Sequence, residues 1–304
     1  MALVNDEALV LRRYPWGESS LIVHLLTPRH GRVHLTARGV FRPTARYFAA
    51  LDLFDTLEIE YSMGPHQELG NLRRAIITRR RPSVCTSLPA YRTGLAALEL
   101  ADIAARPGQS ERPLFTLTEA ALERLEGGQS SLAVSRVIFE LEYLSALGLA
   151  PALSRCAACD GEAPAPPENP LRVPFSAGAG GRLCSPCAAE AQDAGRRVGT
   201  MPEDVLEAAA TLAGMAPIRA QAEAQDPLPS GDATPHLPEE LLSRVRDFLE
   251  RFLDFHLETR PRSHEAFLAS PNRNARKAAG GAPEPRPAQA GAAPANCRRK
   301  TPAP

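Results

Sequence analysis

Lysine is almost absent from this sequence, which carries its positive charge on arginine. Only Lys277 and Lys300 are lysines among the 35 basic residues, and 35 acidic residues bring the formal net charge to zero. A neutral chain offers no evidence for a polyanionic partner. The excess of arginine, alanine and proline is typical of a GC-rich genome, although arginine is also the side chain that forks onto phosphate.

The signature motifs of the common enzyme classes are also missing. The chain has no phosphate-binding loop, no G-x-G-x-x-G after an expected strand, no G-x-S-x-G and no H-E-x-x-H. We therefore do not expect an enzyme. No stretch approaches the roughly 18 apolar residues of a membrane span, and no basic region followed by an apolar core opens the chain. We expect a cytoplasmic protein without membrane contact.

The first 81 residues alternate between apolar and polar positions with a period of two. Turns rich in glycine and proline separate the alternating segments. So many short strands, with no helix to cover them, pack best as a closed or nearly closed barrel. We predict an OB-fold over residues 1–81. Its expected strands are 8–12, 21–26, 32–38, 51–60 and 72–78.

The period changes at Pro82 to that of amphipathic helices. Capping boxes of Thr116 with Glu119, and of Thr200 with Glu203, are expected to open two of the helices. The pattern predicts a helical domain over residues 82–270, in which Cys85 is a small core residue. Beyond residue 270, the Ala, Gly, Pro and Arg composition predicts a disordered basic tail, 271–304. The expected helices are 88–105, 116–126, 132–147, 202–215 and 238–257.

Four of the six cysteines form two C-x-x-C pairs. They are Cys156 with Cys159 and Cys184 with Cys187. Zinc takes four soft ligands in a tetrahedron, and two such pairs can supply them. We predict one structural zinc ion in a module at about 154–190, with a proline-rich loop between the pairs. Because all four ligands come from the chain, no coordination position is left for a substrate. A redox pair and free buried thiols are the alternatives.

Arginines that can meet phosphate lie in three places. The first is the third expected strand and the loop after it, where basic residues stand beside aromatic ones. OB-folds hold single strands in such a groove, and a solvated face over core aromatics is an equally weighted alternative. The second place follows the cysteine module, and the third is the basic tail. The candidate nucleic-acid contacts are Arg32, Arg38, Arg42, Arg46, Arg196 and Arg197.

The sequence resembles the RecO family of bacterial DNA-repair proteins across most of its length, excluding the tail. Three segments resemble the family's N-terminal barrel, one resembles its zinc segment, and a set near the end is similar to its closing signature. The segments are EALVL at 7–11, GESSL at 17–21, LTPRHG at 26–31, FS at 175–176 with GGRLC at 180–184, and His256 with RS at 262–263 and FL at 267–268.

This resemblance implies an OB-fold followed by a helical domain that carries the zinc module. It also implies binding to single- and double-stranded DNA, strand annealing, and loading of the recombinase RecA onto gaps coated with single-strand-binding protein, in concert with RecR. The location would be the cytoplasm, in association with the nucleoid. The loop after the third strand usually carries lysine in the family, whereas Arg38, Arg42 and Arg46 stand here, so the charge is kept.

Two other functional classes are compatible with the residues alone. OB-folds and cysteine quartets also occur in RNA-binding and transcription-associated proteins, so a zinc-ribbon protein of that kind is the main alternative. A thiol oxidoreductase that uses one C-x-x-C pair is the weaker one. Competition between DNA and RNA strands would separate the first alternative, and metal analysis would separate the second.

Overall fold

A computed structural model describes residues 2–41, 50–64, 67–128, 131–215, 237–257, 259 and 261–263. Residues Met1–Ser270 form one unit and Pro271–Pro304 form another. The second unit lies outside the described residues, so the disordered tail stays a prediction. Within the described residues, no helix is both long enough and apolar enough to cross a membrane.

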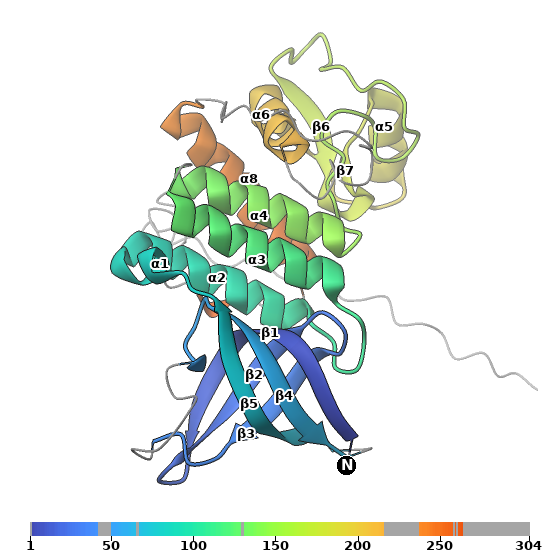
Figure 1. Ribbon diagram of the computed structural model, residues 1–304. Helices are drawn as coiled ribbons and strands as arrows, with labels where there is room; N and C mark the ends of the chain where they lie inside the picture. Colours follow the sequence, from blue (N-terminus) through green and yellow to red (C-terminus); the bar gives the residue numbers. More distant parts are fainter. Residues whose placement is uncertain are drawn as a thin grey trace, which may run out of the picture. The chain divides into compact units, whose positions relative to one another are not determined.

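Five strands of the N-terminal part close into a barrel, in the order β1-β2-β3-β5-β4 (Figure 1). The β3 and β5 strands pair in parallel and the other neighbours pair antiparallel. Alternating residues such as Val23, Leu25 and Leu35 point inward and form the barrel core. The predicted OB-type barrel is therefore confirmed. The strands are β1 (Ala2–Trp16), β2 (Ser20–Thr27), β3 (Gly31–Ala37), β4 (Thr56–Met63) and β5 (Leu69–Arg79).

The fourth strand begins later than predicted, at Thr56. Phe54 has a φ of 75°, in the left-handed region, and such a residue cannot continue a strand. Both Leu51 and Phe54 are nevertheless buried. The apolar residues of 51–55 thus belong to an irregular segment that enters the core. Their spacing resembles that of a strand, which is why the prediction began the strand too early.

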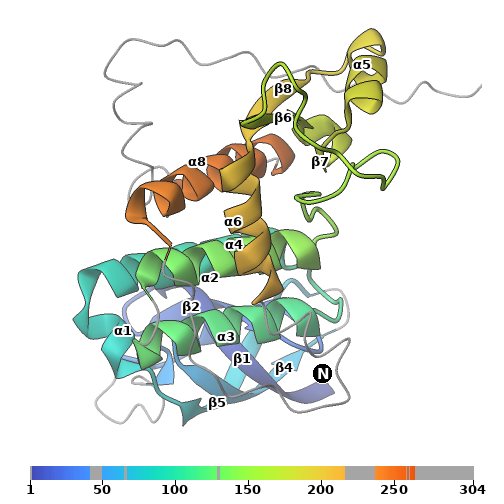
Figure 2. The same cartoon turned by 90° about the horizontal axis from the view of Figure 1, so that it is seen from above.

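Helices make up most of the described residues after the barrel. Each of the five predicted helices is present, and α2, α3 and α4 pack against one another (Figure 2). Their apolar faces share one core with Leu9, Leu26 and Phe54 of the barrel. The helices are α1 (Pro82–Thr86), α2 (Leu88–Ala104), α3 (Arg112–Gly127), α4 (Leu132–Ala146), α5 (Ser185–Asp193), α6 (Glu203–Gly214) and α8 (Glu239–His256).

Both predicted capping boxes are wrong. The α3 helix begins four residues before Thr116, so Thr116 and Glu119 lie inside it. Glu119 instead accepts a hydrogen bond from Thr56 Oγ1 of the barrel, at 2.7 Å. Thr200 lies in β8 (Gly199–Pro202), and Pro202 is the residue before α6. In both cases a tertiary contact or a strand uses the residues that the local pattern assigned to a cap.

A small sheet, not predicted from the sequence, accompanies the cysteine pairs. It has the order β7-β6-β8, where β6 is Arg172–Ser176 and β7 is Gly181–Arg182. The prediction that Cys85 is buried is wrong, because Cys85 lies exposed in the short α1 helix. Strands of two to five residues are too short to show a period, which is why the sequence did not reveal them.

Candidate metal centre and nucleic-acid interface

The four paired cysteines converge on one point. The Sγ atoms of Cys156, Cys159, Cys184 and Cys187 all lie within 4.8 Å of one another. The Sγ atoms of Cys159 and Cys184 are 3.9 Å apart. A zinc ion bound tetrahedrally at about 2.3 Å from each sulfur would hold the sulfurs roughly 3.8 Å apart. The cluster can therefore hold a metal ion, and its four sulfur donors are the set that a structural zinc site uses.

Short local elements place the first cysteine pair. The amide of Cys156 donates to the carbonyl of Gly161 and the amide of Asp160 donates to the carbonyl of Cys156, both at 2.9 Å. Asp160 has a φ of 56°, so the chain turns back on itself directly after Cys159. The amide of Ala157 donates to Arg182 of β7 at 2.8 Å. The turn of residues 156–161 is thereby held against β7, the strand that leads into the second pair.

The second pair stands at the beginning of α5. Cys184 is the residue before the helix and Cys187 lies in its first turn. The glycine run before β7 makes the necessary turn, and at Gly181 (φ 146°) a Cβ atom would lie 2.5 Å from the carbonyl oxygen of Ala152. No other residue fits there without displacing the backbone. The two pairs meet because the chain passes this close to the segment before Cys156.

The electrostatics of the cluster also favour a cation. Burial opposes ionisation of Cys156, but amides of Cys184, Cys159 and Ala158 directed at its sulfur outweigh this and lower its pKa to about 6. The pKa of Cys187 is raised, first by its hydrogen bond with the Cys184 thiol and then by burial. Four thiolates at this distance repel one another unless a positive ion neutralises them. The donor set thus fits a divalent metal ion.

The candidate arginines lie in different environments. Arg38 is exposed directly after β3, and Arg196 and Arg197 are exposed after α5. Arg32 is half-buried, and its Nη1 donates to the carbonyl oxygen of Asp102 in α2 at 2.8 Å. The remaining two candidates, Arg42 and Arg46, lie outside the described residues. Arg32 thus contacts the helices as well as the barrel, which its strand position did not reveal.

The structure shows a row of aromatic rings across the barrel strands that was not predicted from the sequence. His24 and His34 face each other across β2 and β3, stacked with ring centroids 3.9 Å apart. The ring of Tyr14 in β1 meets His24 edge-on at 5.2 Å. Burial lowers the pKa of both histidines; the second cause is the neighbouring His34 for His24, and Arg32 for His34. The sequence alone does not show that these histidines are neighbours, because strand register decides which residues face each other.

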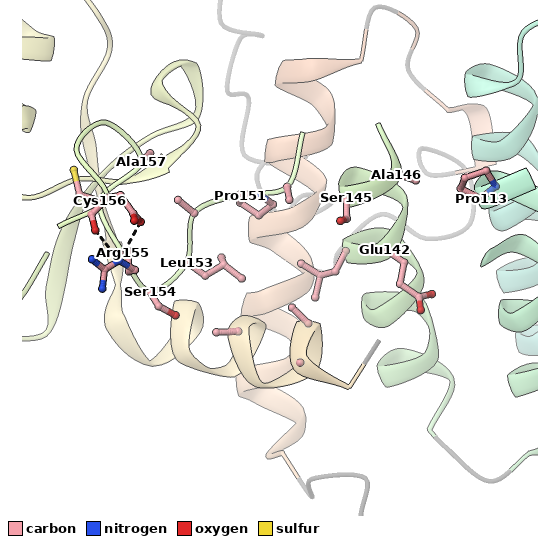
Figure 3. Close-up of a pocket in the computed structure, with 17 residues that line it drawn as sticks. Pro113, Glu142, Ser145, Ala146, Pro151, Leu153, Ser154, Arg155, Cys156 and Ala157 are labelled. Atoms are coloured by element: carbon pink, nitrogen blue, oxygen red, sulfur yellow. Dashed lines mark hydrogen bonds and ion pairs between the residues drawn. The ribbon is translucent and has the colours of Figure 1, made fainter. Parts of the chain in front are cut away.

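A pocket of about 560 Å³ lies between α4, α6 and the segment that leads into Cys156 (Figure 3). Its lining is mainly apolar, with Leu141 and Leu153 among the residues, and it has charged groups at its two ends. Glu142 stands at one end, and Arg155 stands at the other beside Cys156. Burial raises the pKa of Glu142, while Arg124 opposes this with a hydrogen bond of 2.9 Å. The segment around Cys156, which carries the first cysteine pair, therefore forms one wall of this pocket.

These observations define the class of protein. It is a closed OB-type barrel followed by a helical domain, in which a small sheet and α5 carry a four-cysteine cluster able to hold a metal ion. Residues 1–81 match the family described as "Recombination protein O N terminal", and residues 85–197 match "Recombination protein O C terminal". The chain belongs to the RecO family, as its resemblance had indicated.

Relatives of similar length agree with this assignment. The chain is 30% identical to the DNA repair protein RecO of Myxococcus xanthus over 263 residues, which cover 86% of this chain and 96% of that protein. It is 33% identical to the DNA repair protein RecO of Anaeromyxobacter sp. (strain K), over 86% of this chain and 94% of that protein. For the same protein of Anaeromyxobacter dehalogenans (strain 2CP-1), the identity is 34%, over 83% of this chain and 91% of the relative. These relatives are named as DNA repair proteins, and the matched family models describe a recombination protein.

Proposed function

We propose that this protein is a DNA-binding recombination mediator. In this proposal it binds single- and double-stranded DNA, anneals complementary strands, and helps to load RecA onto gaps coated with single-strand-binding protein, together with RecR. The observation that carries the proposal is the match to both RecO families, over residues 1–81 and 85–197. The protein makes and breaks no bond in this scheme, and it acts by holding strands and proteins together.

The exposed arginines provide the electrostatic part of this function. Arg38 is exposed directly after β3, and Arg42 and Arg46 extend the same basic segment of the sequence. Phosphate contacts of this kind bind DNA without regard to its sequence. Arg196 and Arg197 form a second basic pair after the metal-binding module. We assign Arg32 to the same interface, with its side chain held against Asp102.

We propose that the metal ion is zinc and that its role is structural. Cys156, Cys159, Cys184 and Cys187 would be its ligands. When bound, zinc supplies a four-way cross-link and neutralises the thiolates. The four residues would each contribute one thiolate sulfur, which closes the coordination sphere. Elemental analysis is expected to find one zinc ion per chain; a metal-free protein with a reducible disulfide between these cysteines would favour the oxidoreductase alternative instead.

Binding and annealing assays test the proposed function directly. A labelled single strand should bind with an affinity that falls steeply as salt rises, because counterions return to the phosphates. Complementary strands coated with single-strand-binding protein should anneal faster with the protein than without it, in the absence of nucleotide. Absence of binding at low salt would refute the proposal. Competition with an RNA strand of equal length tests the RNA-binding alternative, which requires preference for RNA.

A charge reversal next to β3 is the sharpest mutational test. The double variant Arg38→Glu with Arg42→Glu should bind single strands at least about tenfold more weakly, and its salt slope should be reduced by roughly two. Labelled-oligonucleotide anisotropy at several salt concentrations measures both quantities. The matched control reverses two exposed arginines of the helical part, Arg112→Glu with Arg251→Glu, and keeps the same net charge. Equal losses in the two double variants would remove the barrel from the interface.

A further inference from the structure

The outer wall of the barrel at β1, β2 and β3 carries aromatic rings instead of the usual polar residues. The strands β1, β2 and β3 adjoin one another in the barrel (Figure 1). Their register and burial pattern place Tyr14, Trp16, His24 and His34 at outward positions. Register places Tyr14 opposite Ile22 and Trp16 opposite Ser20, so the rings occupy successive rows of one face. The inward positions of the same strands already fill the barrel core. The barrel core is therefore complete without these four rings.

Two of these rings are strongly exposed. Trp16 is 61% exposed and Tyr14 is 42% exposed, and both stand among the exposed large hydrophobic residues of the described chain. Phe41, 47% exposed, lies close by, because its amide donates to the carbonyl of Ser19 in the β1–β2 turn. A group of exposed aromatic residues on one face is typical of an interaction surface, because a partner that covers the rings removes their apolar area from water. The surface is flanked by the His24–His34 stack, which supports the ring of Tyr14 from one side.

From Arg12 to Trp16 in β1 and along β2 and β3, the charged residues at outward positions are arginine and histidine. The nearest carboxylates of these three strands and their first turn are at the margins of the face, at Glu7 in β1 and at Glu18 in the β1–β2 turn, both exposed. Arg12 stands at the end near α2, where Asp102 binds it at 2.6 Å. Arg38 follows β3 at the opposite end, next to the row of Trp16. A chain of phosphates can therefore follow this wall without meeting a negative side chain of these strand positions.

We propose that this wall stacks the bases of single-stranded DNA, with Trp16 and Tyr14 as the stacking residues and Arg38 as the adjoining phosphate contact. The inference rests on the proposed DNA binding and deepens it, because it names which part of the DNA is held. Stacking on an aromatic ring suits every base, so the site binds without sequence preference. It needs unpaired bases, so the wall distinguishes single strands from duplex. The His24–His34 pair positions the ring of Tyr14, and neither histidine stacks on a base in this proposal.

The unmodified protein supplies its own probe, because Trp16 is the one tryptophan of the chain. A base stacked on an indole quenches its fluorescence. Titration with a twenty-residue oligothymidine at low salt should quench the emission of Trp16, with the same midpoint as the anisotropy of the labelled strand. A duplex of equal length should bind with little quenching. Binding of the oligothymidine without any change at Trp16 would overturn the proposal while leaving DNA binding intact.

A comparison with a strand that lacks bases isolates the stacking. Trp16→Ala should weaken binding of the oligothymidine roughly 5- to 100-fold, and should leave binding of an abasic strand with the same phosphates unchanged. Trp16→Phe keeps a ring and should recover most of the affinity. Leu171→Ala, at another strongly exposed apolar residue (77%), is the matched control and should change neither affinity.

Salt dependence separates stacking from charge and from misfolding. The ratio between the affinities of the parent and Trp16→Ala should stay constant as salt rises, because stacking releases no counterions, whereas the ratio for Arg38→Glu should shrink. Equal losses of Trp16→Ala on the natural and the abasic strands, or no loss on either, would overturn the stacking site. Failure of the parent protein to bind both strands would instead refute the proposed DNA binding itself.

Discussion

Arg81 is a charged side chain that the fold buries completely at the junction of barrel and helices. Its Nη1 donates to the carbonyl of Phe54 at 2.6 Å and to Thr56 Oγ1 at 3.0 Å, and its Nε donates to Glu123 at 2.7 Å. Glu119 contacts its Nη2 at 3.3 Å. A buried cation is tolerated because each donor has a partner. The residue therefore joins the segment before β4 to α3.

Replacement of this arginine should destabilise the protein. In Arg81→Met, two carboxylates and a buried carbonyl lose their donor, so the free energy of unfolding should fall by about 2–4 kcal/mol. Urea unfolding followed by circular dichroism measures the change. The neighbouring Arg80 is exposed, and Arg80→Met should shift stability by less than about 0.5 kcal/mol. Indistinguishable unfolding curves for the two variants would contradict the role of Arg81.

The elements around the cysteine cluster are too small to hold themselves together. The β7 strand has two residues and α5 has nine. Their shared apolar cluster consists of Cys156, Ala163, Leu183, Ala188 and Ala191. Small side chains of this kind bury little area, so the hydrophobic contribution to this module is modest. We therefore expect the metal ion proposed above to supply much of the free energy that orders this module.

Loss of one cysteine ligand should therefore loosen this module selectively. In Cys156→Ser, amide hydrogen exchange over 150–200 should accelerate by at least roughly a hundredfold, with loss of bound zinc, while the strands of the barrel keep their protection. Exchange mass spectrometry and elemental analysis measure the two effects. Cys85→Ser is the matched control, since Cys85 is exposed and outside the cluster, and it should retain zinc and protection. Undiminished protection in Cys156→Ser would show that the metal is dispensable for folding.

The barrel and the helices belong to one compact unit and share a core. Leu9, Leu11, Leu26 and Phe54 of the N-terminal part belong to the same cluster as residues of α2, α3 and α4. At the edge of this contact, the salt bridge of Arg12 in β1 with Asp102 in α2 also connects the barrel to the helices. An outer barrel wall covered by helices loses its protection from water if the helices are removed.

The barrel alone should consequently be a poor folding unit. A fragment of residues 1–81 exposes the leucines that face the helices, so it should aggregate or unfold at least about 10 °C below the full chain. Light scattering and thermal melts compare the two. Replacing Leu9 and Leu26 by threonine in the fragment should restore solubility, if their exposure is the cause. A monomeric fragment as stable as the full chain would contradict the shared core.

Local periodicity predicted most of the elements and missed those set by distant contacts. The barrel strands and the long helices were found because each repeats a pattern over many residues. The onset of β4 was misplaced because Phe54 is buried from an irregular turn. The first capping box was wrong because α3 begins before Thr116 and Glu119 bonds Thr56 of the barrel. The second was wrong because Thr200 lies in β8. A capping pattern describes four neighbouring residues and carries no information on such a partner.

The amino-acid sequence by itself determined which four cysteines come together as a group able to hold a metal ion, and the order of barrel and helices. Cysteine pairs and alternating residues are local patterns, and local chemistry is sufficient to interpret them. Tertiary structure decided that His34 stacks on His24, that Arg32 contacts Asp102 and that Arg81 is buried. Each of these depends on strand register and on the packing of helices against the barrel. Such contacts join residues far apart in the chain, and their geometry exists only after the barrel has closed.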